Sequence, residues 1–96
     1  MKTTYATLIT YTDQGVRNLK QSPQRAKAFR QTAEAAGLKV LAQLWTVGAY
    51  DGLLILEGDS EEKVLGALTQ LASLGNVRTQ SLRAFDADGF AGIVGK

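Results

Sequence analysis

Five side chains in this sequence combine types and positions that could carry chemistry. They are two tyrosines, a tryptophan, an aspartate and an arginine: Tyr11, Trp45, Tyr50, Asp51 and Arg83. The Asp51 carboxylate could act as a general base or anchor a ligand at the mouth of a pocket, and Tyr50 could donate its hydroxyl. Trp45 and Tyr11 could form an aromatic wall for a small apolar ligand.

Each of these residues also has a structural interpretation, which the residue types favour. Asp51 can accept backbone N–H groups in a turn, where Gly48 would supply a positive φ angle. The three aromatic side chains can pack at an interface between subunits, with Tyr11 and Trp45 on the same sheet surface. Arg83 could pair with a bound carboxylate, but an ordinary salt bridge with Asp51 or Asp13 is the default expectation.

The absent residue types narrow the chemistry further. The chain has no cysteine and no histidine, which excludes thiolate nucleophiles, disulfides, the usual general base and the usual haem ligand. The acidic pairs Glu61–Glu62 and Asp86–Asp88 offer too few oxygens for magnesium or calcium. Neither Gly48–Gly52 nor Gly89–Gly95 fits a phosphate-binding loop. We therefore expect no cofactor and no metal site.

The elements that would position these residues begin with a strand over Thr4–Tyr11, rich in β-branched and aromatic residues. A helix is expected to start with Ser22 as its N-cap and Pro23 at its first position, and to end at Gly37. Its apolar stripe is mostly alanine, and its polar positions off that stripe are Arg25, Lys27, Gln31 and Glu34. This helix can therefore pack close to a sheet.

The second half of the chain repeats the pattern of strands followed by a helix. Apolar segments on either side of the Gly48–Asp51 turn predict a hairpin, Leu38–Asp59. Asp59 or Ser60 would cap a second helix that Gly75 ends. A fourth strand follows over Val77–Phe85, and the glycine-containing tail beyond it has a weak helical pattern around Phe90 and Ile93.

The first strand of the hairpin is apolar on both of its faces. One alternation holds Leu38, Val40, Ala42 and Leu44, and the other holds Leu41, Trp45 and Val47. An antiparallel sheet with one face in water should have a polar second alternation. The chain offers only two good helices, and both are expected on one face. A second subunit is therefore the simplest cover for the other face.

Together these elements run β-α-β-β-α-β within 96 residues, a length that suits one domain, 1–96. Right-handed crossovers convert this order into a ferredoxin-like α+β fold. The sheet is expected to be antiparallel and four-stranded in the order 4-1-3-2, with two helices on one face.

Several motifs in matching order resemble the GYD domain family. They are Tyr11-Thr12-Asp13-Gln14-Gly15, Ser22-Pro23 with Arg25, Trp45-Thr46 followed by Gly48-x-Tyr50-Asp51, and Gly75–Thr79 running into Leu82–Phe85. The resemblance implies a ferredoxin-like fold of the dimeric α/β-barrel type, in which two sheets pack face to face. It implies no established biochemical activity. The Gly-x-Tyr-Asp turn is also similar to one in the effector-binding domains of leucine-responsive and asparagine-type transcription regulators, near a small-molecule pocket between subunits.

The charge distribution and the hydropathy of the chain indicate whether it binds nucleic acid or a membrane. The net charge is +2, but residues 1–40 hold seven Lys/Arg against two Asp/Glu. A solvated helix face explains this basic excess more simply than nucleic-acid binding, which we do not expect. The longest aliphatic run, Leu53–Leu56, is too short to span a bilayer, and the N-terminus lacks the plan of a signal peptide. We expect a cytoplasmic protein without membrane contact.

Three functions follow as hypotheses. The first is a homo-oligomer, at least a dimer, that binds a small and partly apolar ligand in a cleft between sheet and helix or between subunits. The second is a cofactor-independent isomerase or monooxygenase that works with Tyr, Asp, Arg and Trp alone. The third is an interaction module that binds protein or nucleic acid through the basic first helix.

Overall fold

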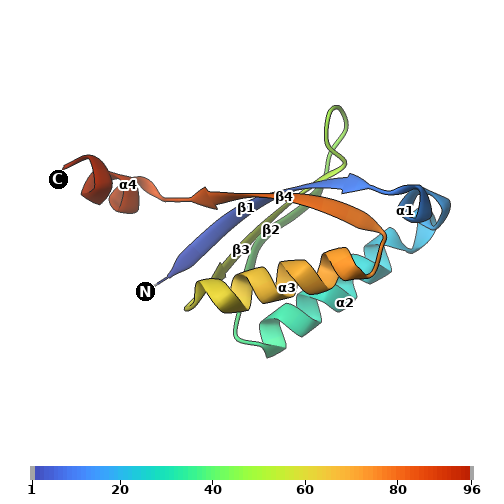
Figure 1. Ribbon diagram of the computed structural model, residues 1–96, viewed down its shortest axis with the longest axis horizontal. Helices are drawn as coiled ribbons and strands as arrows, with labels where there is room; N and C mark the ends of the chain where they lie inside the picture. The colour runs from blue at the N-terminus through green and yellow to red at the C-terminus, as the bar shows by residue number, and fades with distance from the viewer. Residues whose placement is uncertain (1, 96) are drawn as a thin grey trace.

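A computed structural model describes residues 2–95 of the chain (Figure 1). Its elements in order are β1 (Thr3–Tyr11), α1 (Asp13–Arg17), a short 3-10 helix (Leu19–Gln21), α2 (Ser22–Ala35), β2 (Lys39–Trp45), β3 (Gly52–Gly58), α3 (Glu61–Ser73), β4 (Val77–Ala84) and α4 (Ala87–Val94). The four strands form one antiparallel sheet in the order β2-β3-β1-β4. This is the predicted order read from the other edge, and it confirms the ferredoxin-like α+β fold.

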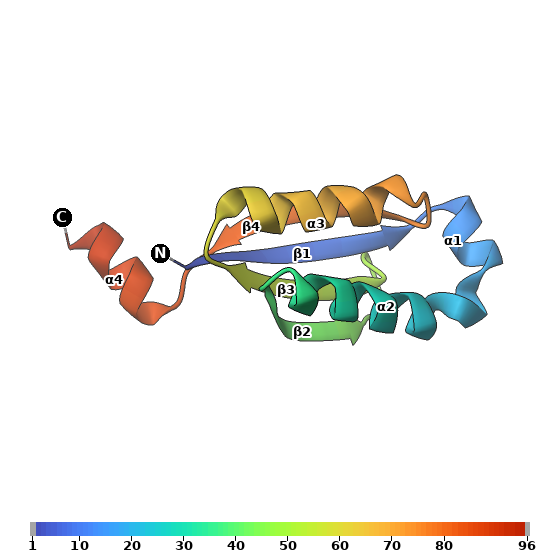
Figure 2. The same cartoon turned by 90° about the horizontal axis from the view of Figure 1, so that it is seen from below.

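The core lies between the sheet and the two long helices, which cover the same face (Figure 2). Leu54 and Leu56 of β3 point into it, as does Thr7 of β1, and all three are fully buried. The helices contribute Ala33 from α2 and Val64 from α3. Burial of apolar surface of this kind contributes about 25 cal/mol for each Å² removed from water. Alternate residues of a strand lie on the same sheet face, so the positions of these buried side chains determine which face the helices cover.

The two long helices begin differently. Ser60 caps α3 by accepting a hydrogen bond from Lys63 N at 3.1 Å, which confirms one of the two predicted caps. The prediction that Ser22 caps α2 is wrong, because Ser22 is itself the first helical residue and Gln21 holds the cap position without a side-chain hydrogen bond. The preceding 3-10 helix leads directly into α2, so no extended residue precedes Pro23. The Ser22 side chain is thereby free for tertiary contacts.

A bulge in β2 changes the predicted alternation of its side chains. The pairing with β3 shifts register between Val40 and Ala42, so Leu41 is extra to the ladder. Val40 then faces the helices opposite Leu56, and Trp45 lies on the same side opposite Gly52. The prediction that Val40 and Trp45 occupy opposite faces is therefore wrong, since the inserted residue reverses the alternation beyond it.

Figure 1 shows both long helices on one side of the sheet, and the other sheet face carries no helix among residues 2–95. That face is largely apolar at its centre. Its cross-strand neighbours include Leu8 with Leu53 and Ala6 with both Ile55 and Leu82. Leu82 packs beside aliphatic neighbours, yet 49% of its surface is exposed to solvent. We call this surface the open face; its apolar members are Ala6, Leu8, Ala42, Leu44, Leu53, Ile55 and Leu82.

The tail forms the helix α4, in agreement with the helical pattern predicted around Phe90 and Ile93. It extends away from the sheet beyond the end of β4 (Figures 1 and 2). Phe90, Ile93 and Val94 are each at least half exposed there. No helix within residues 2–95 has the length and apolar content needed to cross a membrane.

Candidate functional site

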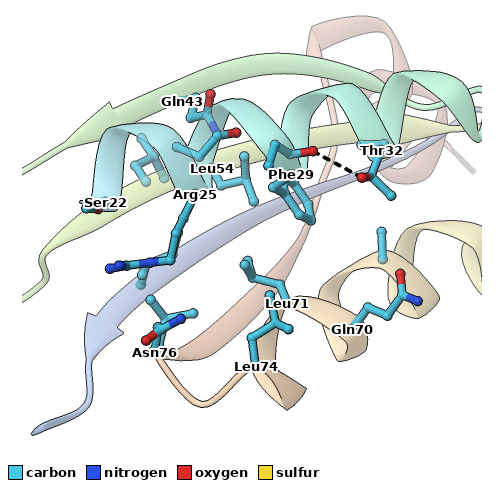
Figure 3. A pocket seen from close by; sticks show the side chains of 18 of the residues that line it. Ser22, Arg25, Phe29, Thr32, Gln43, Leu54, Gln70, Leu71, Leu74 and Asn76 are labelled. Atoms are coloured by element: carbon cyan, nitrogen blue, oxygen red, sulfur yellow. Dashed lines mark hydrogen bonds between the residues drawn. The ribbon is translucent and has the colours of Figure 1, made fainter. Parts of the chain in front are cut away.

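A cleft of about 700 Å³ lies between α2, α3 and the helix-covered face of the sheet (Figure 3). Its interior is apolar, with side chains from both helices and the central strands: Phe29, Ala33, Leu54, Ala67, Leu71 and Leu74. This volume is typical of pockets for small molecules, which span about 300–1,000 Å³. Small residues create the space, because the alanines along α2 and Ala67 on α3 do not fill the gap between the helices.

One end of the cleft holds a hydrogen-bonded cluster of three side chains from three elements. The Tyr11 hydroxyl, at the end of β1, lies 2.5 Å from Ser22 Oγ, at the start of α2. Trp45 Nε1, at the end of β2, lies 3.1 Å from both oxygens and donates to them. The indole is thereby held against the sheet and helix, although 52% of the residue is exposed. This cluster gives the cleft an aromatic wall at one end and confirms that Tyr11 and Trp45 share a sheet surface.

Asp51 fixes the end of β1 beside this cluster. Its Oδ2 atom accepts a hydrogen bond from Tyr11 N at 2.9 Å, and its backbone N–H donates to Ile9 O at 2.8 Å. Gly48, in the same loop, has the predicted positive φ angle, 119°. Asp51 therefore accepts a backbone N–H from the end of β1, whereas the turn interpretation placed the donor within the turn. Asp51 also lines the cleft. Its role toward a ligand stays a prediction.

Tyr50 lies on the other side of the sheet from Trp45. Its hydroxyl donates to Gln80 Oε1 at 3.3 Å, and Gln80 is the cross-strand partner of Leu8 on the open face. Tyr50 is not among the residues that line the cleft. The structure thus brings Tyr11, Trp45 and Asp51 together and places Tyr50 at the opposite surface.

Arg83 is remote from the other predicted site residues. In the antiparallel register it pairs with Tyr5, whereas Tyr11 pairs with Val77 at the far end of the same ladder. Its guanidinium lies 4.5 Å from the centre of the Phe85 ring and donates to two backbone carbonyls. The expected salt bridge of Arg83 with Asp51 or Asp13 is wrong, because the register separates them. The ion pairs within residues 2–95 are Lys2–Glu57 and Arg30–Glu34.

The Arg83 end of the sheet holds a second tyrosine contact. The Tyr5 hydroxyl donates a hydrogen bond of 2.5 Å to Glu61 Oε1, which ties β1 to the first turn of α3. This hydrogen bond to Glu61 raises the pKa of Tyr5 above its ordinary value of 10.0; desolvation and the Glu61 charge act in the same direction, while Arg83 opposes them. Across the described part of the chain, no three Asp or Glu side chains gather closely enough to hold a metal ion.

The sequence analysis missed Arg25 as a residue of the cleft. Arg25 had been placed off the apolar stripe of its helix, yet it lines the cleft four residues before Phe29. Its Nη1 atom donates to Asn18 O at 2.8 Å, and its Nη2 atom is buried without a hydrogen-bond partner among residues 2–95. The signal that could have found it is the i, i+4 spacing to Phe29, which places both on neighbouring positions of one helix face.

Comparison with known proteins gives a consistent picture of the family and fold. Residues 5–94 match the family model described as the GYD domain. A Thermus thermophilus protein named "Glutamine synthetase and cystathionine beta-lyase binding protein" is 37% identical over 82 residues, which cover 84% of this chain and 86% of that protein. The crystal structure of the leucine response regulatory protein LrpA of Mycobacterium tuberculosis superposes with a TM-score of 0.61 at 19% identity. That match covers 88% of this chain and about half, 51%, of the regulator, and it shows a shared fold.

Proposed function

Because this chain belongs to the GYD domain family, we propose that it is a homodimeric binding module that holds a small, partly apolar ligand in the cleft between α2 and α3. The observation that carries this proposal is the cleft itself, with its volume of about 700 Å³. It combines an apolar interior with polar groups of Ser22, Arg25 and Asn76 at one end. An apolar cavity with a few convergent polar groups is the usual form of a ligand site.

The open face supports the homodimer. It is a sheet surface with aliphatic side chains on all four strands, and Leu44 and Leu82 are about half exposed. A large exposed apolar patch of this kind marks an interaction surface. Two copies related by a twofold axis would cover it with the same patch from each subunit. The helices lie on the opposite face (Figure 1), so this pairing leaves the cleft between them uncovered in each subunit.

A neutral fluorescent amine, N-phenyl-naphthylamine, tests the ligand proposal. Trp45 is the single tryptophan of the chain and lines the cleft, so binding there should quench its emission by energy transfer as the amine becomes bright. Thr32→Phe fills the cleft from α2 and should weaken binding, whereas Gln31→Phe adds the same ring outside the cleft lining. Absence of binding to the unmodified chain, or equal binding to both variants, would contradict the proposal.

The name of the Thermus relative favours a second candidate function, the binding of a partner enzyme. The outer side of α2 offers a surface for this, because Lys27 and Arg30 are exposed there. Purified glutamine synthetase and cystathionine beta-lyase, immobilised in turn, would test the idea. Binding that Lys27→Glu weakens and Thr69→Glu, at an exposed position of α3, leaves unchanged would support this surface, and no binding to either enzyme would reject it.

A further inference from the structure

We infer that the ligand of the cleft carries a carboxylate, and that Arg25 binds this group while the apolar body lies along Phe29 and Leu71. The inference rests on the proposed function and specifies the chemical class of its ligand. It depends on three features of the cleft: the hydrogen bonding of Arg25, the charges around it and the apolar surface that leads away from it.

The guanidinium of Arg25 is incompletely satisfied. One of its nitrogens donates to the backbone carbonyl of Asn18, and Nη2 is buried without a partner among the described residues. A buried N–H of a charged group without an acceptor destabilises the folded chain, because it has lost its hydration. The guanidinium carries five N–H donors in a planar fork that matches a carboxylate. An anion beside Arg25 would therefore supply the acceptor that the protein lacks.

Arg25 lines the cleft, so a molecule bound there can supply the missing hydrogen-bond acceptor. Figure 3 shows its side chain extending from α2 across the cleft toward Asn76. A single hydrogen bond to Asn18 holds its end, so a rotation of the flexible side chain can turn Nη2 toward a bound molecule. Neither ion pair of residues 2–95 involves Arg25, so its charge has no carboxylate partner there.

The other residues of the lining favour a carboxylate attached to an apolar body over a small inorganic anion. The charged residues that line the cleft are Arg25, Lys63 and Asp51. Asp51 already accepts the Tyr11 N–H, and Lys63 belongs to the first turn of α3, at the opposite end of the cleft from the start of α2 (Figure 2). Between these ends the surface is mainly apolar, with Phe29 and Leu71 facing the space, and its polar side chains, such as Thr32 and Gln70, are uncharged (Figure 3). A molecule that fits both features has one anionic end and an apolar remainder.

Decanoate and decanol provide a matched pair of probes, because they share an apolar chain and differ in the anionic group. Their affinities would be measured by displacement of N-phenyl-naphthylamine from the unmodified chain. A charge-assisted hydrogen bond is about twice as strong as a neutral one, so decanoate should bind about tenfold more tightly than decanol. Equal affinities, or tighter binding of decanol, would overturn the inference without any variant.

Variants then assign the preference to Arg25. Arg25→Met keeps an unbranched apolar stem and should remove the advantage of decanoate over decanol. Lys63→Met removes the other cationic group of the lining and should preserve the advantage. Loss of the preference in Lys63→Met, or its persistence in Arg25→Met, would overturn the assignment. If Arg25→Met does not fold, Arg25→Gln keeps a donor for Asn18 O and makes the same comparison.

The same measurements separate this inference from the proposed function. If the neutral amine and decanol do not bind, the cleft takes no apolar ligand and both proposals fail. If both neutral molecules bind and decanoate gains nothing from its charge, the binding function stands and only the carboxylate inference fails.

Discussion

Trp45 Nε1 donates a hydrogen bond to Ser22 Oγ at 3.1 Å, so the last residue of β2 is joined to the first residue of α2. The Tyr11 hydroxyl lies within hydrogen-bonding distance of both groups. Ser22 is 8% exposed, and its single hydroxyl therefore serves two aromatic side chains from a largely buried position. This cluster is what turns three separated parts of the sequence into one wall of the cleft.

Removal of the Ser22 hydroxyl should destabilise the fold. We expect Ser22→Ala to lower the free energy of unfolding by about 0.5–1.5 kcal/mol, because the partly buried Tyr11 hydroxyl and the Trp45 indole N–H each lose the Ser22 hydroxyl as a hydrogen-bond partner. Urea unfolding followed by circular dichroism would measure the loss. Ser73→Ala is the matched control, since Ser73 is exposed and donates only to Gln70 O within its own helix. An equal effect of the two substitutions would contradict a special role for Ser22.

Gly15 should tolerate no side chain. A Cβ atom at this position would lie 2.0 Å from the backbone carbonyl oxygen of Asn76, so α1 or the turn before β4 would have to move. We expect Gly15→Ala to destabilise the fold by about 1–3 kcal/mol, as overpacking of a fitted contact does. Thermal or urea unfolding measures this change.

Gly66 is the matched control for that substitution. It lies in α3, and a Cβ atom there would meet nothing within 4 Å. Gly66→Ala should therefore stabilise the chain by up to about 1 kcal/mol through helix propensity. Destabilisation by both glycine substitutions would show that the close approach at Gly15 is not the cause.

The open face should control self-association. We expect the unmodified chain to have twice its monomer mass of 10.3 kDa in light scattering. Leu82→Glu places a charge among the apolar side chains of this face and should raise the dimer dissociation constant about tenfold or more, because the carboxylate would lose its hydration. Leu65→Glu, a partly exposed position on α3, should leave the mass unchanged. A monomer at micromolar concentration would contradict the pairing.

The Tyr5–Glu61 hydrogen bond should make stability fall at alkaline pH. The pKa of Tyr5 is raised in the folded chain above its ordinary value of 10.0, chiefly by the hydrogen bond to Glu61. The unfolded chain therefore loses this proton first. The stabilisation is fully present below pH 10.0 and is lost as the pH rises through the folded pKa.

Urea unfolding over a pH series that passes 10.0 measures this loss. Tyr5→Phe should flatten the alkaline part of the profile, while Tyr50→Phe, at the open face, should leave it unchanged. An identical alkaline slope in the unmodified chain and Tyr5→Phe would refute the assignment to Tyr5.

The elements of this fold and their order were predictable from the sequence because their signals are local. Ser60 precedes two glutamates and an apolar helical stripe, Gly37 ends α2 with a φ angle of 89°, and Gly48 shapes the hairpin loop. Each signal depends on the conformational preferences of a few neighbouring residues. The general handedness of crossovers then converts the order of elements into the order of strands.

Tertiary structure alone decided the composition of the site. The bulge at Leu41 reversed the faces of β2 beyond it, and the register of β4 carried Arg83 away from Asp51. The helical segments after β1 lead directly into α2, so Ser22 is a helical residue and not the N-cap. Arg25 lines the cleft because space remains between α2 and α3. These outcomes depend on contacts between residues far apart in the chain, which local preference does not encode. Strand identity is a property of a few adjacent residues, whereas a cleft exists only when several elements pack incompletely against one another.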